Sequence, residues 1–169
     1  MNVSTSKLRD FSGLRIAVIF IATIGVGITY LLNPASRVLQ DPLERFLAAF
    51  TGTVLSWFNS SVQIYDSTIV IESFAANIVP ACTGLFTTTI YIAAVLAYPC
   101  SLKRKLQGVV LGVAAIMLVN AIRIISLLVV GAYWIDAFDF AHLVIWQTVA
   151  VVFAVFLWLF WIQRFAHEK

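Results

Sequence analysis

The sequence predicts an all-α integral membrane protein with about four transmembrane helices, an amphipathic interfacial helix and a short extracytoplasmic β-hairpin. Hydrophobic residues make up 62% of the 169 residues and charged residues 11%, against roughly 45–50% and 25% in soluble domains. The mean hydropathy is +0.98. A soluble fold of this size has too little interior to bury so much apolar surface. The composition therefore excludes a disordered chain, a collagen, a disulfide-stapled secreted domain and a nucleic-acid-binding domain.

Four apolar segments reach the roughly 20 residues that a helix needs to cross a bilayer. They cover residues 14–32, 78–99, 107–134 and 141–162 of a single membrane domain, 1–169. The third is long enough to be tilted. The first exceeds the 7–15 residues of a signal-peptide core, so we expect a retained span rather than a cleaved leader.

The stretch 33–77 is predicted to lie outside the cytoplasm. Lys and Arg residues favour the cytoplasmic side of a membrane. They cluster before the first span, between the second and third, and after the fourth: Lys7, Arg9, Arg15, Lys103, Arg104, Lys105, Arg164 and Lys169. Both termini are then cytoplasmic. Apolar residues at helical spacing over 43–58 predict the interfacial helix. Alternation over 62–73 predicts the hairpin, with its turn at Asp66-Ser67.

Two polar residues lie within the third predicted span, where a polar side chain is energetically costly. Such a residue is a candidate functional residue. Arg123 is the one charge well inside a predicted span, and Asn120 lies on the same helical face. Snorkelling to the headgroups is the alternative for Arg123. About nine residues of helix, roughly 14 Å, separate it from the outer end of the span. We therefore favour a polar cavity lined by protein.

The second and fourth spans carry a thiol and an imidazole near their outer ends. Cys82 and Cys100 are roughly 27 Å apart if the second span is helical, too far for a disulfide. Pro80 suits the first position of a helix, so Cys82 is expected in the first turn, where a thiolate is favoured. His142 opens the fourth span, with Asp139 as the expected N-cap. Ordinary packing for Cys82 and an interfacial position for His142 are the alternatives.

The positions of Cys82, Arg123 and His142 along their spans place the three side chains at a similar depth. At 1.5 Å per residue, Cys82, Arg123 and His142 lie about 28, 26 and 33 Å above the cytoplasmic ends of their spans. A nucleophile, a cation and a base at one depth suit acyl transfer by a cysteine. No metal or serine-hydrolase motif competes, and we expect no cofactor and no metal. Gly108 and Gly112 indicate helix packing at most.

The chain resembles the exosortase/archaeosortase family over roughly residues 60–160, as a short, single-domain subtype. The resemblance rests on three motifs in order: Pro80-Ala81-Cys82-Thr83-Gly84-Leu85, Asn120-Ala121-Ile122-Arg123-Ile124 and His142. Thr83 stands where many members have Ser, and the extra spans of longer members are missing. The resemblance implies a multi-pass cysteine protease or transpeptidase of the cell membrane, whose active site faces the extracytoplasmic side.

By resemblance, Cys82, Arg123 and His142 are the catalytic residues. Asn120 is expected to orient Arg123, and Asp139 to orient His142. The implied partner is a protein whose C-terminal tail holds a short motif, a transmembrane helix and a basic cluster, and no nucleic acid is expected. The alternative is a non-enzymatic membrane module, such as a transporter subunit or a scaffold of an exopolysaccharide or secretion complex. Only the enzyme requires the thiol, guanidinium and imidazole to converge.

The predicted topology is tested with fusion reporters. A reporter after Ser61 should score as external and one after Lys105 as cytoplasmic, because the basic clusters fix the orientation. The reverse result at either site would contradict the depths assigned above.

Overall fold

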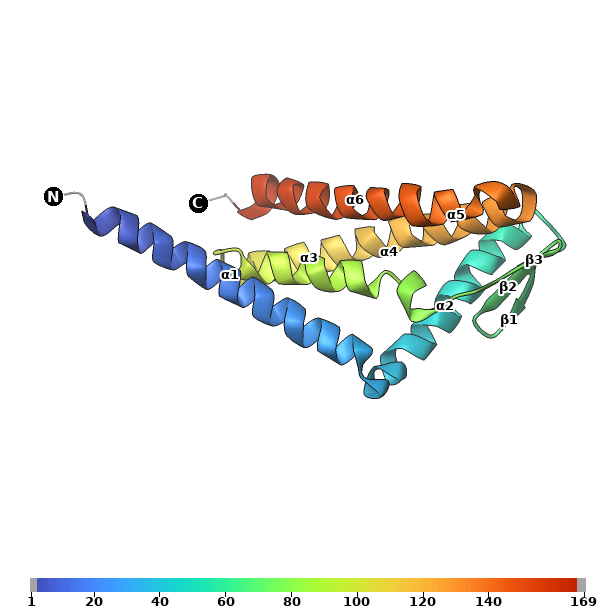
Figure 1. Cartoon of the computed structure of the whole chain (residues 1–169), viewed down its shortest axis with the longest axis horizontal. Helices are drawn as coiled ribbons and strands as arrows, with labels where there is room; N and C mark the ends of the chain where they lie inside the picture. The colour runs from blue at the N-terminus through green and yellow to red at the C-terminus, as the bar shows by residue number, and fades with distance from the viewer. Residues whose placement is uncertain (1–2, 167–169) are drawn as a thin grey trace.

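In the computed structural model, residues 3–166 are described, with side chains from residue 13 onward. Long helices run beside one another, and a small sheet lies at the end opposite the two chain termini (Figure 1). The elements are α1 (Val3–Leu32), the 3₁₀ turn η1 (Pro34–Ser36), α2 (Arg37–Ser56), β1 (Gln63–Tyr65), β2 (Thr68–Ile71), β3 (Phe74–Asn77), the 3₁₀ turn η2 (Pro80–Cys82), α3 (Leu85–Ala97), α4 (Leu102–Tyr133), the 3₁₀ turn η3 (Ile135–Ala137), α5 (Phe138–Phe140), the π-helical turn η4 (Ala141–Ile145), α6 (Trp146–Trp161) and the π-helical turn η5 (Ile162–Ala166).

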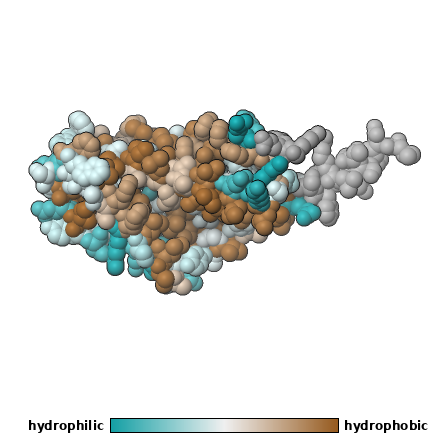
Figure 2. All heavy atoms as spheres, turned by 180° about the vertical axis from the view of Figure 1, so that it is seen from behind, coloured by the Kyte–Doolittle hydropathy of each residue, from teal (hydrophilic) through white to brown (hydrophobic). Residues whose placement is uncertain are grey.

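Three helical segments within the described residues are long and apolar enough to cross a membrane: Gly13–Leu32, Leu102–Tyr133 and Ile135–Ala166. Figure 2 shows an apolar band over the middle of the molecule with hydrophilic residues toward both ends. The prediction of four spans is not confirmed, because the fourth apolar helix, α3, has only 13 residues. Its length of about 20 Å is short of the roughly 30 Å hydrocarbon core.

The helix of the second predicted span begins late because the chain breaks before it. Val79 is extended, Pro80 starts a 3₁₀ turn, and Gly84 takes the left-handed conformation with φ of 77°. The prediction that Cys82 lies in the first turn of a continuous helix is therefore wrong. Cys82 ends the 3₁₀ turn, and α3 starts only at Leu85. Such irregular backbone is tolerated at membrane depth where protein surrounds it.

Buried polar side chains form the corner between α1 and α2. Gln40 Nε2 donates to the carbonyl oxygen of Leu31 at 2.8 Å and to Ser36 Oγ at 2.7 Å. Ser36 Oγ also donates to the Leu31 carbonyl at 3.0 Å. These bonds satisfy a carbonyl that has no partner within the last turn of α1. They hold α2 at an angle to α1, so that α2 leads back toward the sheet (Figure 1).

The helix predicted over residues 43–58 is present as α2, which starts at Arg37 rather than residue 43. Its position at the membrane interface stays a prediction. Its buried face is mixed, since Glu44 and Thr51 are buried beside Leu47, whereas Phe46 and Phe50 are exposed. Burial raises the pKa of Glu44, an effect that the nearby Arg37 guanidinium partly offsets. A helix that turns its aromatic side chains outward is suited to the lipid interface.

The predicted hairpin is present and is extended by a third strand. β1, β2 and β3 form an antiparallel sheet in that order, with Gln63 opposite Val70 and Val70 opposite Ala75. Ile69 and Ile71 are buried beneath the sheet. Ile69 belongs to a core with six other buried residues, which are Leu47, Ala48, Leu55, Ile78, Ile124 and Leu128. The sheet is thus anchored to α2 and to the C-terminal half of α4.

A hydrogen-bonded network fixes the turn between β2 and β3. Glu72 has φ of 52°, a conformation uncommon outside glycine. Its carboxylate accepts hydrogen bonds from Asn59 Nδ2 at 3.1 Å and from Ser61 Oγ at 3.0 Å. Both bonds hold the pKa of Glu72 below its usual range. Asn59 Nδ2 also donates to the Tyr133 hydroxyl at 2.9 Å, which ties this turn to the end of α4.

At the opposite end, glycines let α3, α4 and α6 approach closely. A Cβ at Gly112 would overlap the ring of Tyr91, and one at Gly108 would overlap the indole of Trp161. The Tyr91 hydroxyl donates to the Gly108 carbonyl at 3.1 Å, and Arg104 Nη1 donates to the Ala166 carbonyl at 3.2 Å. The two glycines therefore serve helix packing, as their spacing indicates.

Gly112→Ala should lower the stability of the protein by about 1–3 kcal/mol, the usual cost of overpacking. Tyr91 is only 2% exposed, so its ring has little room to move. Gly25→Ala in α1 is the matched control, because a Cβ there meets nothing within 4 Å. Thermal unfolding in detergent should give a lower Tm for Gly112→Ala alone. Equal Tm values for the two variants would contradict the close approach of α3 and α4.

Candidate active site at the break before α3

Cys82 and His142 line the same cavity, which has a volume of about 340 Å³. The other lining residues come from β3 and the segment after it (74–79), from α4 (Ile124, Leu127 and Leu128) and from α5 (Phe138). The cavity lies between the sheet and the helices at the end of the molecule away from the chain termini (Figure 1). The break before α3 and the start of the last long helix are therefore brought to one place.

The backbone around Cys82 is held from both sides. The Cys82 N–H donates to the Val79 carbonyl at 2.7 Å within the 3₁₀ turn. The Cys82 carbonyl accepts from Asn120 Nδ2 at 2.8 Å, and Asn120 is buried. Thr83 is fully buried, and its hydroxyl donates to the Pro80 carbonyl at 2.7 Å. The thiol thus projects from a loop whose polar groups are bonded to protein.

Gly84 is required at the break for two reasons. Its φ of 77° is a conformation that residues with a Cβ rarely adopt. A Cβ there would also lie 3.1 Å from Asn120 Cγ and 3.3 Å from its Oδ1. Gly84 therefore allows Asn120 to approach the loop and reach the Cys82 carbonyl. The sequence predicts that Asn120 orients Arg123, whereas the Asn120 side chain donates to the Cys82 carbonyl.

Arg123 is half-buried on α4, one turn after Asn120. Both residues line a small cavity of about 30 Å³ together with Gly84 and Trp146. Within residues 13–166, Arg123 Nε is buried without a hydrogen-bond partner. A buried donor without a partner is costly, so this N–H is available to an oxygen that enters the site. The guanidinium also lies close enough to His142 for their charges to interact.

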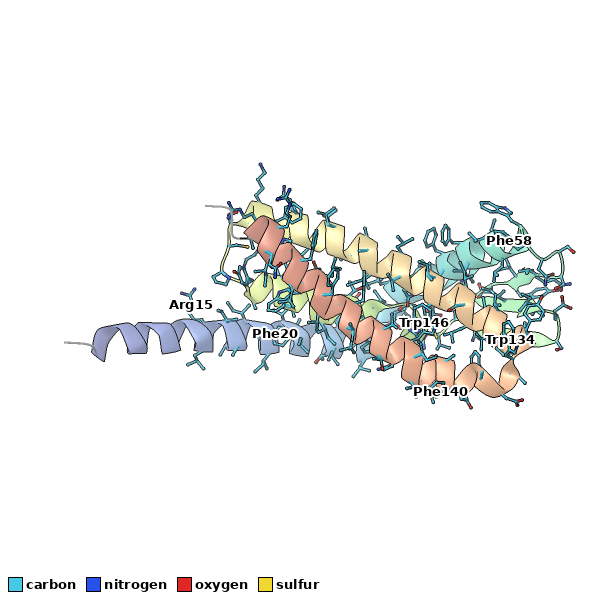
Figure 3. The ribbon with its side chains drawn as sticks, turned by 90° about the horizontal axis from the view of Figure 1, so that it is seen from above. Arg15, Phe20, Phe58, Trp134, Phe140 and Trp146 are labelled. Carbon is cyan, nitrogen blue, oxygen red and sulfur yellow. The ribbon has the colours of Figure 1, made fainter. Side chains whose placement is uncertain are left out.

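His142 is held by a π-helical turn and by aromatic rings. The turn Ala141–Ile145 interrupts the α-helical path of the last long helix, a feature common at functional sites. The Phe138 ring lies 5.7 Å from the imidazole and 5.3 Å from the ring of Phe74 on β3. Figure 3 shows Trp134 and Phe140 at the end where α4 turns into α5. The imidazole is thereby connected to the sheet.

Asp139 does not take the predicted N-cap position. The N-cap of α5 is Ala137, and Asp139 lies in the first turn of the helix with its side chain exposed. The prediction places the helix start too late, because the chain is already helical from Phe138. The Asp139 carboxylate still lies close enough to His142 for an electrostatic interaction.

The structure therefore brings Cys82 and His142 to one cavity, whereas Arg123 lines a separate, smaller cavity and is linked to His142 by an electrostatic interaction. Sequence reasoning missed Phe74, Phe138 and the third strand. The signal for Phe74 and Phe138 is weak, since the sequence holds 13 phenylalanines and nothing in their spacing sets these two apart. Cys100 packs at the opposite end, in the core that contains Tyr91 and Trp161, and both cysteines are free.

Comparison with known proteins identifies one family. The family model described as transmembrane exosortase matches residues 9–162, which is more than half of the chain. No curated protein and no solved structure matches the chain. The matched range includes the break before α3, the polar face of α4 and the π-helical turn. The protein belongs to the transmembrane exosortase family.

Proposed function

We propose that the protein is a membrane-embedded cysteine protease or transpeptidase that cleaves C-terminal sorting tails of exported proteins. The observation that carries this proposal is the cavity shared by Cys82 and His142, with Arg123 close enough to His142 for an electrostatic interaction. A structural module has no reason to gather a thiol, an imidazole and a guanidinium, whereas acyl transfer needs all three groups. Family membership supports the same class of reaction.

The first half of the reaction forms a thioester. Cys82 Sγ attacks the carbonyl carbon of the scissile peptide bond, and His142 accepts the thiol proton. The carbonyl oxygen becomes an oxyanion, which Arg123 stabilises with the N–H groups that face the site. When the intermediate collapses, the C–N bond breaks and His142 returns the proton to the departing amine. The tail leaves with a new amino terminus.

The second half consumes the thioester. An amine, a hydroxyl group or water attacks the acyl carbon, and His142 removes its proton. The C–S bond breaks, and Cys82 is regenerated. An amine or hydroxyl acceptor makes the reaction a transpeptidation or esterification, and water makes it a hydrolysis. Asp139, whose charge reaches His142, stabilises the imidazolium in both halves.

The active site is proposed to face the extracytoplasmic side of the cell membrane. Lys103, Arg104 and Lys105 lie in the first turn of α4 at the end near the chain termini, whereas the cavity lies at the sheet end (Figure 1). Basic residues favour the cytoplasm. The substrate tail, with its motif, transmembrane helix and basic cluster, would then cross the bilayer beside the enzyme and present its motif at the cavity.

Cys82→Ala should abolish tail removal, whereas Cys100→Ser should leave it nearly intact. Only Cys82 lines the cavity, and a thioether or thioester cannot form without its sulfur. The measurement is the size of a co-expressed reporter that carries a C-terminal motif, a transmembrane helix and a basic cluster. Full processing by Cys82→Ala would exclude the cysteine mechanism.

Arg123→Lys should lose roughly 10²–10³ in rate, the usual effect of removing one oxyanion donor. Guanidinium offers a planar fork of donors, whereas ammonium is a point charge on a flexible chain. The rate of processing is measured together with the abundance of the variant in the membrane. A snorkelling Arg123 would be replaced freely by lysine, so a wild-type rate for Arg123→Lys would leave Cys82 and His142 as a dyad.

A further inference from the structure

The edge strand β3 borders the candidate active site. The sheet order is β1-β2-β3, so β3 pairs on one side only, with β2. Its residues Phe74, Ala75, Ala76 and Asn77 all line the cavity that contains Cys82 and His142. An unpaired strand edge exposes N–H and C=O groups that another chain can bind.

The register of the sheet shows which backbone groups are free. In an antiparallel pair, hydrogen-bonded and non-hydrogen-bonded residue pairs alternate. The Ile78 N–H donates to the Ser67 carbonyl at 2.8 Å, so Ser67 and Ile78 are a hydrogen-bonded pair. Two residues further along each strand, Ile69 lies opposite Ala76 and is the next hydrogen-bonded pair. The backbone groups of Ala76 therefore face β2. Those of Ala75 and Asn77 face away, and no backbone bond outside the sheet is recorded for either residue within 3–166.

The cavity follows this free edge rather than one face of the sheet. Side chains alternate between the two faces of a strand, so a cavity over one face would touch every second residue. The lining instead includes every residue from 74 to 79. The opposite wall is apolar and comes from α4 and α5, with Ile124, Leu127 and Phe138. The cavity is thus mainly apolar, and it runs beside the strand edge on which the peptide groups of Ala75 and Asn77 are free of β2.

We propose that the free edge of β3 binds an extended segment of the substrate polypeptide as an additional strand. This proposal rests on the proposed function and specifies how the peptide is held. The N–H and C=O groups of Ala75 and Asn77 pair with the substrate backbone, and its apolar side chains contact α4 and α5. The small side chains of Ala75 and Ala76 leave room for the bound chain.

The bound segment is the one that precedes the scissile bond. In the proposed function, the chain after that bond leads into a transmembrane helix and must therefore run toward the bilayer. The chain before it lies on the sheet side, where β3 is. From Asn77 the cavity continues past Val79 to Cys82, so a segment paired with β3 delivers its last carbonyl carbon to the thiol.

The test uses three thiol reagents on the purified full chain in detergent. Acetyl-Ala-Ala-Ala chloromethyl ketone offers an extended backbone, and its analogue methylated on each amide nitrogen lacks the N–H donors. In both, the Cys82 thiolate displaces chloride to form a thioether. Iodoacetamide reports the reactivity of the thiol alone. Labelling rates at Cys82 are followed by mass spectrometry.

The peptide reagent should label Cys82 roughly two- to tenfold faster than its N-methylated analogue, because the analogue loses hydrogen bonds to the edge of β3. Ala75→Pro should reduce this ratio toward one. Proline removes only an N–H that faces away from β2, a position where edge strands tolerate it. Iodoacetamide labelling shows whether the variant still presents its thiol.

Ile64→Pro is the matched control on the other edge strand. The N–H and C=O groups of Ile69 point toward β3 and so do not bond to β1. Ile64 lies opposite Ile69 on β1. The N–H and C=O groups of Ile64 therefore point away from β2, toward the free edge of β1. This variant should keep the wild-type ratio. Equal rates for the two peptide reagents on the wild type would overturn the strand-binding proposal alone. Failure of iodoacetamide to prefer Cys82 over Cys100 would instead contradict the proposed function.

Discussion

The hydrogen bond from Asn120 Nδ2 to the Cys82 carbonyl is the contact on which the candidate site depends. A helix broken near the bilayer leaves peptide groups that lipid cannot satisfy. α4 supplies the missing partner, and Gly84 allows the close approach. The same bond fixes Cys82 relative to Arg123, since Asn120 and Arg123 are one turn apart on one helix. The Asn120 side chain thus both satisfies a peptide carbonyl at the break and fixes the position of Cys82 relative to α4.

The two ends of the molecule are built differently because they do different work. Helix association in lipid relies on close packing rather than on the hydrophobic effect. At the end near the termini, Gly108 and Gly112 provide that packing against Trp161 and Tyr91. At the other end, α2 and the sheet build a core around Leu47 and Ile69. That core supports the wall of the cavity that Cys82 and His142 line, and the residues of β3 border the same cavity.

The candidate residues were predictable from the sequence, but the reason given for one of them was wrong. Arg123 and His142 stand out because charged and imidazole side chains are rare in apolar spans. Both lie on long helices, where the rise of 1.5 Å per residue applies. Cys82 was placed by the same rule, although its segment is not a continuous helix. It still lines the cavity, because the Asn120 hydrogen bond holds the loop against α4.

By itself, the sequence determined the membrane class, the long apolar helices, the amphipathic helix and the hairpin, because hydrophobic periodicity and turn residues act locally. The tertiary structure alone decided the third strand, the late start of α3 and the π-helical turn that carries His142. Phe74–Asn77 has little strand propensity and pairs only because β2 lies beside it. The partner of Asn120 is 38 residues away in the chain, and no local pattern encodes a contact that only folding brings together.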